Sequence, residues 1–472
     1  MARVDGCGDG AHRRLRFAEC LGPAVLLCVI FASLLGVPAR ADSHSALPAY
    51  AIEQFGYPPP IPNGPLPQDR FAAVERLLAH SLNPSDDAGV EAAILRDTLA
   101  TADPRVAWLI VDIMRFTWRQ DYYVALAEVA RALLATEFQS ISVRDEISNR
   151  LIAWRVPAYP GYLEHKRAVF TRYVRGLDVL FKPGDIAWER VSWGGVNIDS
   201  RPYGKTDTPC DCIPAADDPA VTSAAEATWL KDEDIVFGLA VNGEYRAYPR
   251  RILEVREMVN DTLGGRQLGI PYCSLCGAAQ AYFTDRLPDA IARPVLRTSG
   301  LLIRSNKVMY DLNTHSLFDT FRGLAVTGPL AKAGVALTPV AVVTARWGDW
   351  KAAHPETTVL VESLALGRDY KLRETRDARG PVFPVGDVDP RLPVHEDIVG
   401  VVTSNGTAVA FPRVTALLAL EAGEAVELRG VRLRLAAGGL RARDEGGRDL
   451  ASHPAYWFAW SQFHPETLLW AP

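Results

Sequence analysis

The chain has 472 residues, of which 48% are hydrophobic and 23% charged, the composition of a soluble globular protein with room for two or three domains. Its formal net charge is −5, and the first 41 residues carry five arginines and three acids, so the remainder has a charge of −5 − 2 = −7. A mildly acidic body argues against nucleic acid as a partner.

Residues 1–41 predict an export signal. An arginine cluster at 13–16 precedes an uncharged run at 21–39, and Ala-Arg-Ala at 39–41 has the small-x-small pattern of a cleavage site. We therefore expect a mature chain that begins at Asp42 and is periplasmic or otherwise exported. The alternative is an uncleaved segment that anchors the chain, and membrane contact is expected in that case alone.

Two segments of different composition follow the signal. Residues 42–67 are proline-rich and predict an extended linker. Residues 68–183 contain successive blocks with helical spacing of apolar side chains, for example Phe71-Val74-Leu77-Leu78, and Asp103-Pro104 has the pattern of a helix start. We expect an all-helical array here, resembling the two-helix repeats of solenoid proteins.

From residue 184 to residue 472 the chain consists of short strand-like runs broken by Gly, Pro and Asp, which predicts a β-rich domain and an α+β fold overall. Two landmarks recur there in the same order. The motif Asn-Gly-x-x-x-Ala-aromatic-Pro-Arg occurs at 242–250 and 405–413, and Trp-x-x-Trp-x-x-x-His-Pro-Glu-Thr occurs at 347–357 and 457–467.

This repetition predicts two related β units, about 234–360 and 397–472. Asp234 in the first unit is matched with Asp397 in the second by their common Asp-Ile-Val. We expect a long insert in the first unit alone, and therefore the chemistry in that unit and a scaffolding role for the second. The histidines His354 and His464 occupy equivalent places in both units, which favours a structural role over metal ligation.

The stretch Gly269–Phe283 holds a Cys-x-x-Cys pair, Cys273 and Cys276, followed directly by Gly277. Two sulfurs at this spacing can form a disulfide, act as a redox dithiol or hold one face of a metal ion. The glycine lets the backbone fold closely around the second sulfur. If the signal is removed, Cys7, Cys20 and Cys28 leave with it, and the four remaining cysteines are Cys210, Cys212, Cys273 and Cys276.

Motifs around this pair resemble an uncharacterised, mostly exported prokaryotic family, domain of unknown function 3179, over about residues 211–470. The resemblance implies that Cys-x-x-Cys is the family hallmark, and that some members carry selenocysteine there, which favours a redox or nucleophilic role. This chain has Ser274 where proline is usual and Arg256 where histidine is common. The motifs that carry the resemblance are Ile213-Pro214 with Asp217 and Pro219, Ala247-Tyr248-Pro249, Glu257-Met258-Val259-Asn260-Asp261, Tyr272-Cys273-Ser274-Leu275-Cys276-Gly277, Ser299-Gly300-Leu301, Asn306, Met309-Tyr310-Asp311 and Ser316.

The four cysteines leave two chemistries open. As thiolates they could hold zinc or copper together. In an oxidising compartment, Cys210 and Cys212 would more readily bond to Cys273 and Cys276 than to each other, because cysteines two apart close a disulfide under strain.

A redox thiol needs a nearby cation, for which Arg256 and Arg266 are candidates. A cleft beside the redox pair is expected, and the family match nominates Asn260, Asp261 and Asp311 as catalytic residues beside the sulfurs. We expect Ser299, Asn306 and Tyr310 to line the cleft with them. Met309 and His315 could complete a copper site, although core packing and a turn are the simpler roles for them.

The leading hypothesis is an exported thiol/disulfide redox protein that acts on a thiol, disulfide or protein partner. The second is a cysteine-based zinc or copper protein without turnover, and the third is an interaction protein with structural disulfides.

Overall fold

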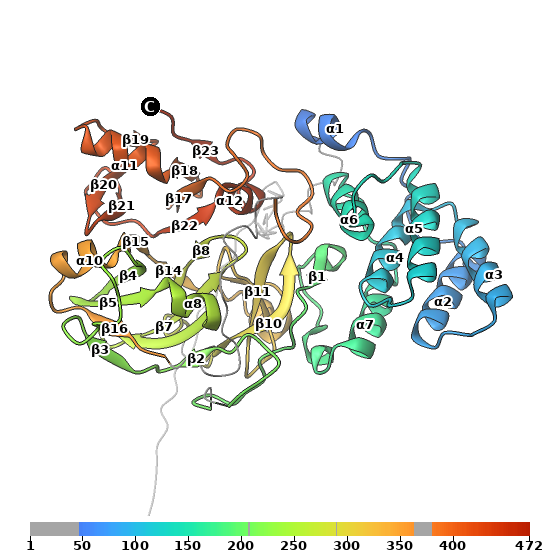
Figure 1. Ribbon diagram of the computed structural model, residues 1–472, viewed down its shortest axis with the longest axis horizontal. Coiled ribbons are helices and arrows are strands. Elements are labelled where there is room, and N and C mark those ends of the chain that lie inside the picture. The colour runs from blue at the N-terminus through green and yellow to red at the C-terminus, as the bar shows by residue number, and fades with distance from the viewer. Residues whose placement is uncertain (1–46, 206–207, 289, 363–379) are drawn as a thin grey trace, which may run out of the picture. The chain divides into compact units, whose positions relative to one another are not determined.

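The computed structural model describes residues 47–205, 208–288, 290–362 and 380–472 (Figure 1). The predicted export signal lies outside these residues, so its cleavage stays a prediction. Residues Ala46–Pro472 belong to one compact unit. Within the described residues, no helix is both long enough and apolar enough to cross a membrane.

The predicted helical array is present, coloured blue to cyan-green in Figure 1. Four helices coincide with the apolar blocks of the sequence, and the side chain of Asp103 accepts a hydrogen bond from the Arg105 amide at the predicted helix start. The elements are α1 (Ala49–Phe55), α2 (Gln68–Leu82), α3 (Ala88–Leu99), η1 (Pro104–Val106), α4 (Ala107–Met114), α5 (Gln120–Leu134), α6 (Val143–Ala153), α7 (Tyr162–Tyr173), η2 (Leu177–Leu180) and η3 (Trp188–Arg190).

The proline-rich segment contains the short helix α1, so it is not extended throughout. It lies on the helical array: the indole of Trp154 donates to the carbonyl of Gly56 at 3.0 Å, and Arg105 donates to the carbonyl of Gly64 at 2.7 Å. These bonds order a stretch that has little core of its own.

The described residues of the rest of the chain are β-rich and form five small sheets. One sheet has the strand order β1 (Val191–Trp193), β10 (Leu296–Ile303), β11 (Asn306–Asp311), β12 (Leu317–Asp319), β13 (Leu324–Ala325). The cysteine sheet has the order β14 (Thr338–Val340), β9 (Ala281–Phe283), β7 (Arg266–Cys273), β6 (Met258–Leu263), β2 (Ala216–Asp217), and β8 (Ala278–Ala279) also pairs with β7.

The two sequence landmarks build two more sheets with one connectivity. The first-motif sheet has the order β15 (Val343–Arg346), β4 (Ile235–Val241), β5 (Glu244–Pro249), β16 (Thr358–Leu360), β3 (Val221–Ser223), with helices α8 (Arg250–Arg256) and α10 (Trp347–Ala353). The second-motif sheet has the order β22 (Ser452–Tyr456), β17 (Asp397–Val402), β18 (Ala408–Pro412), β23 (Leu468–Leu469), with helices α11 (Arg413–Glu421) and α12 (Trp457–Phe463). In each, the first three strands pair antiparallel and the fourth pairs parallel.

The strand register corrects the residue matching between the two motifs. Gly238 pairs with Ala247 in the first-motif sheet, and Gly400 pairs with Ala410 in the second, which makes Asp234 equivalent to Glu396 rather than to Asp397. The reason is a hairpin that is one residue longer in the second motif. Three residues separate the hydrogen-bonded pair Thr403 and Thr407, whereas two separate Val241 and Glu244.

Each motif also packs a tryptophan on a glycine of its own sheet. A Cβ atom on Gly238 would lie 2.2 Å from the Trp350 ring, and one on Gly400 would lie 2.1 Å from the Trp460 ring. The indole nitrogens donate to Thr357 at 3.0 Å and to Thr467 at 2.8 Å. The spacing that the two copies of the landmark share therefore reflects the same local packing of tryptophan on glycine in both sheets.

The expectation that the first motif alone carries an insert is wrong. The second motif contains a small sheet of β19 (Glu427–Leu428), β20 (Val431–Ala436) and β21 (Gly439–Arg443) between α11 and β22. The remaining helix, α9 (Gly328–Lys332), lies between β13 and β14.

Candidate functional site: the Cys273–Cys276 turn

The Cys-x-x-Cys pair lies in a tight hairpin between β7 and β8. Cys273 pairs with Ala278, and the amide of Cys276 donates to the carbonyl of Cys273 at 3.1 Å. Gly277 has φ +58°, and a Cβ atom there would lie 2.9 Å from the ring of Tyr456. Glycine is therefore required both by the backbone conformation and by the close approach of β22.

Two disulfides are present among the described residues, Cys273–Cys276 and Cys210–Cys212. The Cα atoms of Cys273 and Cys276 are 5.3 Å apart, which confirms the predicted disulfide reach.

The expected cross-pairing of Cys210 and Cys212 with the other two cysteines is wrong. The amide of Asn197 donates to the carbonyl of Asp211, and Asn197 forms a bridge with Cys212, so their segment is held beside residue 197. Each cysteine pair therefore closes on itself.

A cavity of about 200 Å³ opens beside the turn, and we call it the Cys273 cavity. Cys273 lines it, as predicted for one member of the pair, and Cys276 is fully buried. The polar lining comes from Glu257, Ser274, Thr298 and Lys307, and the remaining wall is formed by Gly194, Val196, Ile213, Leu275, Gly300, Leu301, Leu302, Val382 and Phe383.

A buried ion pair faces this cavity. Nζ of Lys307 lies 3.0 Å from a carboxylate oxygen of Glu257 and donates to the Glu257 backbone carbonyl at 2.6 Å. The hydroxyl of Ser274 donates to the other carboxylate oxygen at 2.8 Å. Burial lowers the pKa of the Lys307 ammonium, and the Glu257 carboxylate opposes that shift. Ser274 thus adds a hydrogen bond between the turn and the ion pair.

Lys307 is the cation that sequence reasoning missed. The expected cation Arg266 lies at the opposite end of β7 from Cys273 and pairs with Asp285 at 2.8 Å. Arg256 is ion-paired with Glu362. Lys307 occupies β11, all of whose residues are buried, so a lysine that looks like a solvent-facing strand residue lies inside the fold. The one sequence feature that could have identified Lys307 is its position directly after Asn306, a residue that carries the resemblance.

The two sulfurs have different surroundings. The carbonyl oxygen of Ser305 lies 3.5 Å from Sγ of Cys276 and 4.0 Å from Sγ of Cys273. It belongs to a two-residue hairpin turn in which Arg304 and Ser305 have φ of 49° and 65°. After reduction, this carbonyl would accept a bond from a Cys276 thiol and disfavour its thiolate. Cys273, which shares its cavity with Lys307, is therefore the better nucleophile.

The other predicted site residues do not line the Cys273 cavity. Arg246 and Tyr248 donate to the carboxylate of Asp261, and Asp311 accepts from the amides of Val295 and Thr314. The expected cleft wall of Asn260, Asp261, Ser299, Asn306, Tyr310 and Asp311 is therefore wrong for the Cys273 cavity, because none of these residues lines it. A catalytic role for Asn260, Asp261 and Asp311 stays a prediction.

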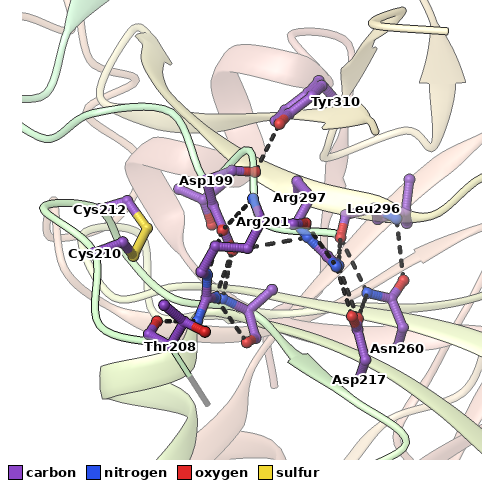
Figure 2. A network of polar contacts seen from close by, with 12 residues as sticks. Asp199, Arg201, Thr208, Cys210, Cys212, Asp217, Asn260, Leu296, Arg297 and Tyr310 are labelled. Atoms are coloured by element: carbon purple, nitrogen blue, oxygen red, sulfur yellow. Dashed lines mark hydrogen bonds and ion pairs between the residues drawn. A yellow bond between two sulfur atoms is a disulfide. The ribbon is translucent and has the colours of Figure 1, made fainter. Parts of the chain in front are cut away.

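Asn260 belongs to the buried polar network in Figure 2. Its amide donates to Asp217 at 2.9 Å and to the carbonyl of Leu296 at 3.0 Å, and its oxygen accepts from the Leu296 amide. Arg297, which is fully buried, donates to Asp217 at 2.8 Å. These bonds connect β2, β6 and β10, so the network joins two sheets.

Cys210, Cys212 and Asp199 lie at the edge of this network, and their potential ligand atoms are within 4.8 Å of one another. Both Asp199 oxygens accept bonds from Arg201, at 2.7 and 2.8 Å, and one also accepts from the Ala215 amide. The two sulfurs are bonded to each other. While the disulfide is closed this donor set offers no thiolate and its carboxylate is shared with a cation, so a metal would need reduced Cys210 and Cys212.

The four cysteines do not form one metal site within the described residues, since the cluster contains neither Cys273 nor Cys276. The expected copper ligands take their simpler roles: Met309 is fully buried in an apolar cluster, and His315, at φ 55°, lies in the turn between β11 and β12.

Comparison with known proteins gives one result. Residues 210–432 match the family model described as "Protein of unknown function (DUF3179)". Neither the curated proteins nor the solved structures gave a match. The match includes both cysteine pairs, Glu257 and Lys307, so the residues of the candidate site belong to the family segment. Residues 210–432 are thus similar to the family of proteins of unknown function, DUF3179, that the motifs of the sequence resemble.

Proposed function

We propose that this chain is an exported thiol–disulfide exchange protein whose redox centre is Cys273–Cys276. The observation that carries the proposal is the placement of Cys273, one member of this disulfide, at the wall of a cavity that is also lined by a buried ion pair, Lys307 and Glu257. A structural disulfide needs no cavity and no adjacent cation, whereas a reactive cysteine needs access and a group that favours its thiolate.

The exchange with a partner dithiol proceeds in two substitutions. One partner thiolate attacks Sγ of Cys273, which forms a mixed disulfide and releases Cys276, and Cys276 takes up a proton and donates to the carbonyl of Ser305. The second partner thiolate then attacks the partner's own sulfur in the mixed disulfide and releases Cys273 as a thiolate. Two electrons pass from the partner, which becomes a disulfide, to the cysteine pair. The reverse sequence reduces a partner disulfide, and the relative potentials set the direction.

Trapping of the mixed disulfide tests this proposal. Reduced Cys276→Ser protein should react with glutathione disulfide at Cys273, and Cys273→Ser protein should react much more slowly at Cys276. Intact-mass spectrometry after quenching in acid measures both. The matched control is the Cys210→Ser/Cys212→Ser protein, which should exchange like the parent. A Cys276→Ser protein that stays unmodified while it is folded would contradict the proposal.

Metal binding remains the second candidate, for the cluster of Cys210, Cys212 and Asp199. The cation Arg201 beside this carboxylate disfavours it. Metal analysis of protein purified without chelators, together with a count of free thiols, separates the candidates. One zinc or copper per chain with four free thiols would favour the metal protein, and no metal with two disulfides would favour the exchange protein or a structural role.

Export and duplication complete the proposal. We infer that the chain is cleaved after Ala41, and N-terminal sequencing of the exported protein checks this. We also infer that the first- and second-motif sheets are copies of one ancestral unit. The order shared by four strands, which the first-motif sheet extends with β3, and the Trp350–Gly238 and Trp460–Gly400 contacts support the common origin.

A further inference from the structure

A second cavity, of about 480 Å³, lies between the edge strand β14 of the cysteine sheet and the edge strand β22 of the second-motif sheet. We call it the Gln280 cavity. Nothing in the exchange chemistry uses it. Its volume falls within the range of small-molecule sites. The polar and aromatic side chains that line it are Gln280, Tyr282, Arg322, Ser452, His453 and His464, with the rings of Phe321 and Trp460.

Two polar side chains at this cavity have no hydrogen-bond partner among the residues that the structure describes. Both the nitrogen and the oxygen of the Gln280 amide are buried without a hydrogen bond, and so is the hydroxyl of Ser452. Each residue is 2% exposed. Buried polar groups are almost always paired, because an unpaired one keeps the full cost of its desolvation. A donor and an acceptor left open together on one amide call for a ligand that supplies both.

The second-motif sheet lacks an aromatic ring that the first-motif sheet has beside the equivalent histidine. In the first-motif sheet, Tyr245 stacks on His354 with ring centroids 3.9 Å apart. The register makes Ala408 the equivalent of Tyr245, and His464 the equivalent of His354. A tyrosine ring is thus replaced by a methyl group at the histidine that lines the cavity.

The register also makes His453 the equivalent of Val343, because these residues pair with Gly400 and Gly238. Nδ1 of His453 lies 3.2 Å from the carbonyl of Pro454 and donates to it, which leaves Nε2 as an acceptor. Burial lowers the pKa of His453 to about 4 and that of His464 to about 3, so both rings are neutral at pH 7.

The charge at the cavity is already balanced. Arg322 is the charged residue of the described lining, and its guanidinium lies 3.8 Å from the Asp319 carboxylate and donates to the carbonyl of Phe463. A neutral ligand therefore suits the cavity better than an anion. The aromatic wall is built of rings in contact: the ring centroids of Trp460 and His464 are 4.2 Å apart with their planes tilted by 39°, and Phe321 stacks on Phe463, outside the lining, with centroids 4.9 Å apart.

We propose that the Gln280 cavity binds a small uncharged organic molecule with a planar ring and a cis-amide edge, that is, an adjacent N–H donor and carbonyl acceptor. The edge pairs with the amide of Gln280 through two hydrogen bonds, and the ring packs on the aromatic wall. This function goes beyond thiol–disulfide exchange and does not depend on the cysteines.

The probe that tests it is 2-pyridone, and the matched probe is N-methyl-2-pyridone, which keeps the ring and the carbonyl but lacks the donor. Titration calorimetry and ligand-observed NMR on the mature chain should show saturable binding of 2-pyridone, and at least about tenfold weaker binding of the N-methyl compound. Benzoate, planar but anionic, should bind more weakly than 2-pyridone.

Three variants separate the site from the fold. Gln280→Met should weaken 2-pyridone binding at least about tenfold and should melt at or above the parent temperature, because the unpaired amide is removed. Gln462→Met replaces a glutamine of α12 outside the cavity lining and should leave binding unchanged. Ala408→Tyr rebuilds the ring found in the first-motif sheet and should abolish binding in a protein with the parent's circular dichroism.

Four results would overturn the proposal. They are equal binding of the two pyridones, tighter binding of benzoate, binding that survives Gln280→Met, and the absence of saturable 2-pyridone binding. A Gln280→Met protein less stable than the parent would show that Gln280 has a structural partner, which also contradicts it. None of these results bears on glutathione exchange at Cys273, so the two proposals fail independently.

Discussion

Nζ of Lys307 lies 3.0 Å from a carboxylate oxygen of Glu257, and both side chains are buried beside the Cys273–Cys276 turn. The pair connects β11 to the end of α8, where Glu257 has φ 50°. Ser274 binds the same carboxylate from the turn itself. The charge that would favour a Cys273 thiolate is thus fixed by three separate segments of the chain.

Removing one partner of this ion pair should destabilise the fold. Lys307→Met leaves the Glu257 carboxylate buried without its cation, and we expect the free energy of unfolding to fall by about 3–5 kcal/mol. The double variant Lys307→Met/Glu257→Gln should recover most of that loss. Denaturant unfolding of the reduced and oxidised proteins measures it. A single variant as stable as the parent would show that the pair is not buried in solution.

Asn260 should behave as a structural residue. Asn260→Ala removes the bonds to Asp217 and Leu296, and we expect a loss of about 1–3 kcal/mol from the buried groups left unpaired. The reactivity of Cys273 towards glutathione disulfide should stay within about twofold of the parent, since Asn260 does not line the Cys273 cavity. A large fall in reactivity with unchanged stability would instead support the catalytic role that the family motif predicts.

The paired glycines under the two tryptophans should respond alike. Gly238→Ala and Gly400→Ala each place a methyl group against an indole, and we expect each to cost about 1–3 kcal/mol through overpacking. Gly446→Ala is the matched control, because a Cβ atom there would meet only the Asp444 carboxyl, at 3.3 Å. It should stay within about 0.5 kcal/mol of the parent. Thermal and denaturant melts measure these losses. If the losses for Gly238→Ala and Gly400→Ala differ by more than this margin, the common-origin proposal is weakened.

Acid should destabilise the protein partly through two histidines. The folded pKa of His453 is about 4 and that of His464 about 3, below the ordinary value of 6.5. Between those values the unfolded chain binds more protons than the folded chain, so the stability contribution is present above pH 6.5 and is lost as the pH falls towards 3. The unfolding free energies of the parent and of the His453→Gln/His464→Gln variant are measured from pH 7 to pH 4. As the pH falls, the parent should lose more unfolding free energy than the variant. A difference that is flat with pH would contradict it.

Local patterns in the sequence predicted much of the fold. The apolar spacing at Phe71-Val74-Leu77-Leu78 locates α2 because amphipathic helices repeat with the helical period, and Asp103 caps its helix as its type and position predict. The β-rich character of the second part of the chain followed from Gly, Pro and Asp between short apolar runs. The register between the two motifs could not be predicted, because a one-residue change in a hairpin shifts the matching without changing the landmarks.

The site was predictable in its cysteines and not in its charges. Cys273 and Cys276 are only three positions apart in the sequence and enclose a turn, so local geometry brings them together. Lys307 and Glu257 are brought to them by tertiary packing, and neither side chain carries a local signal of burial. The pairing of Cys210 with Cys212 was predicted wrongly for a related reason. The prediction considered only the strain of a disulfide between cysteines two residues apart, whereas the segment is held in place by a tertiary contact with Asn197.

The reduction potential of the Cys273–Cys276 disulfide tests the central claim most directly. We would equilibrate the Cys210→Ser/Cys212→Ser protein with glutathione redox buffers, quench it in acid and count alkylated thiols by mass spectrometry. A redox-active pair beside Lys307 should have a potential above about −270 mV, in the range of thiol–disulfide oxidoreductases. A potential below about −300 mV is typical of structural disulfides in secreted proteins and would contradict the exchange function.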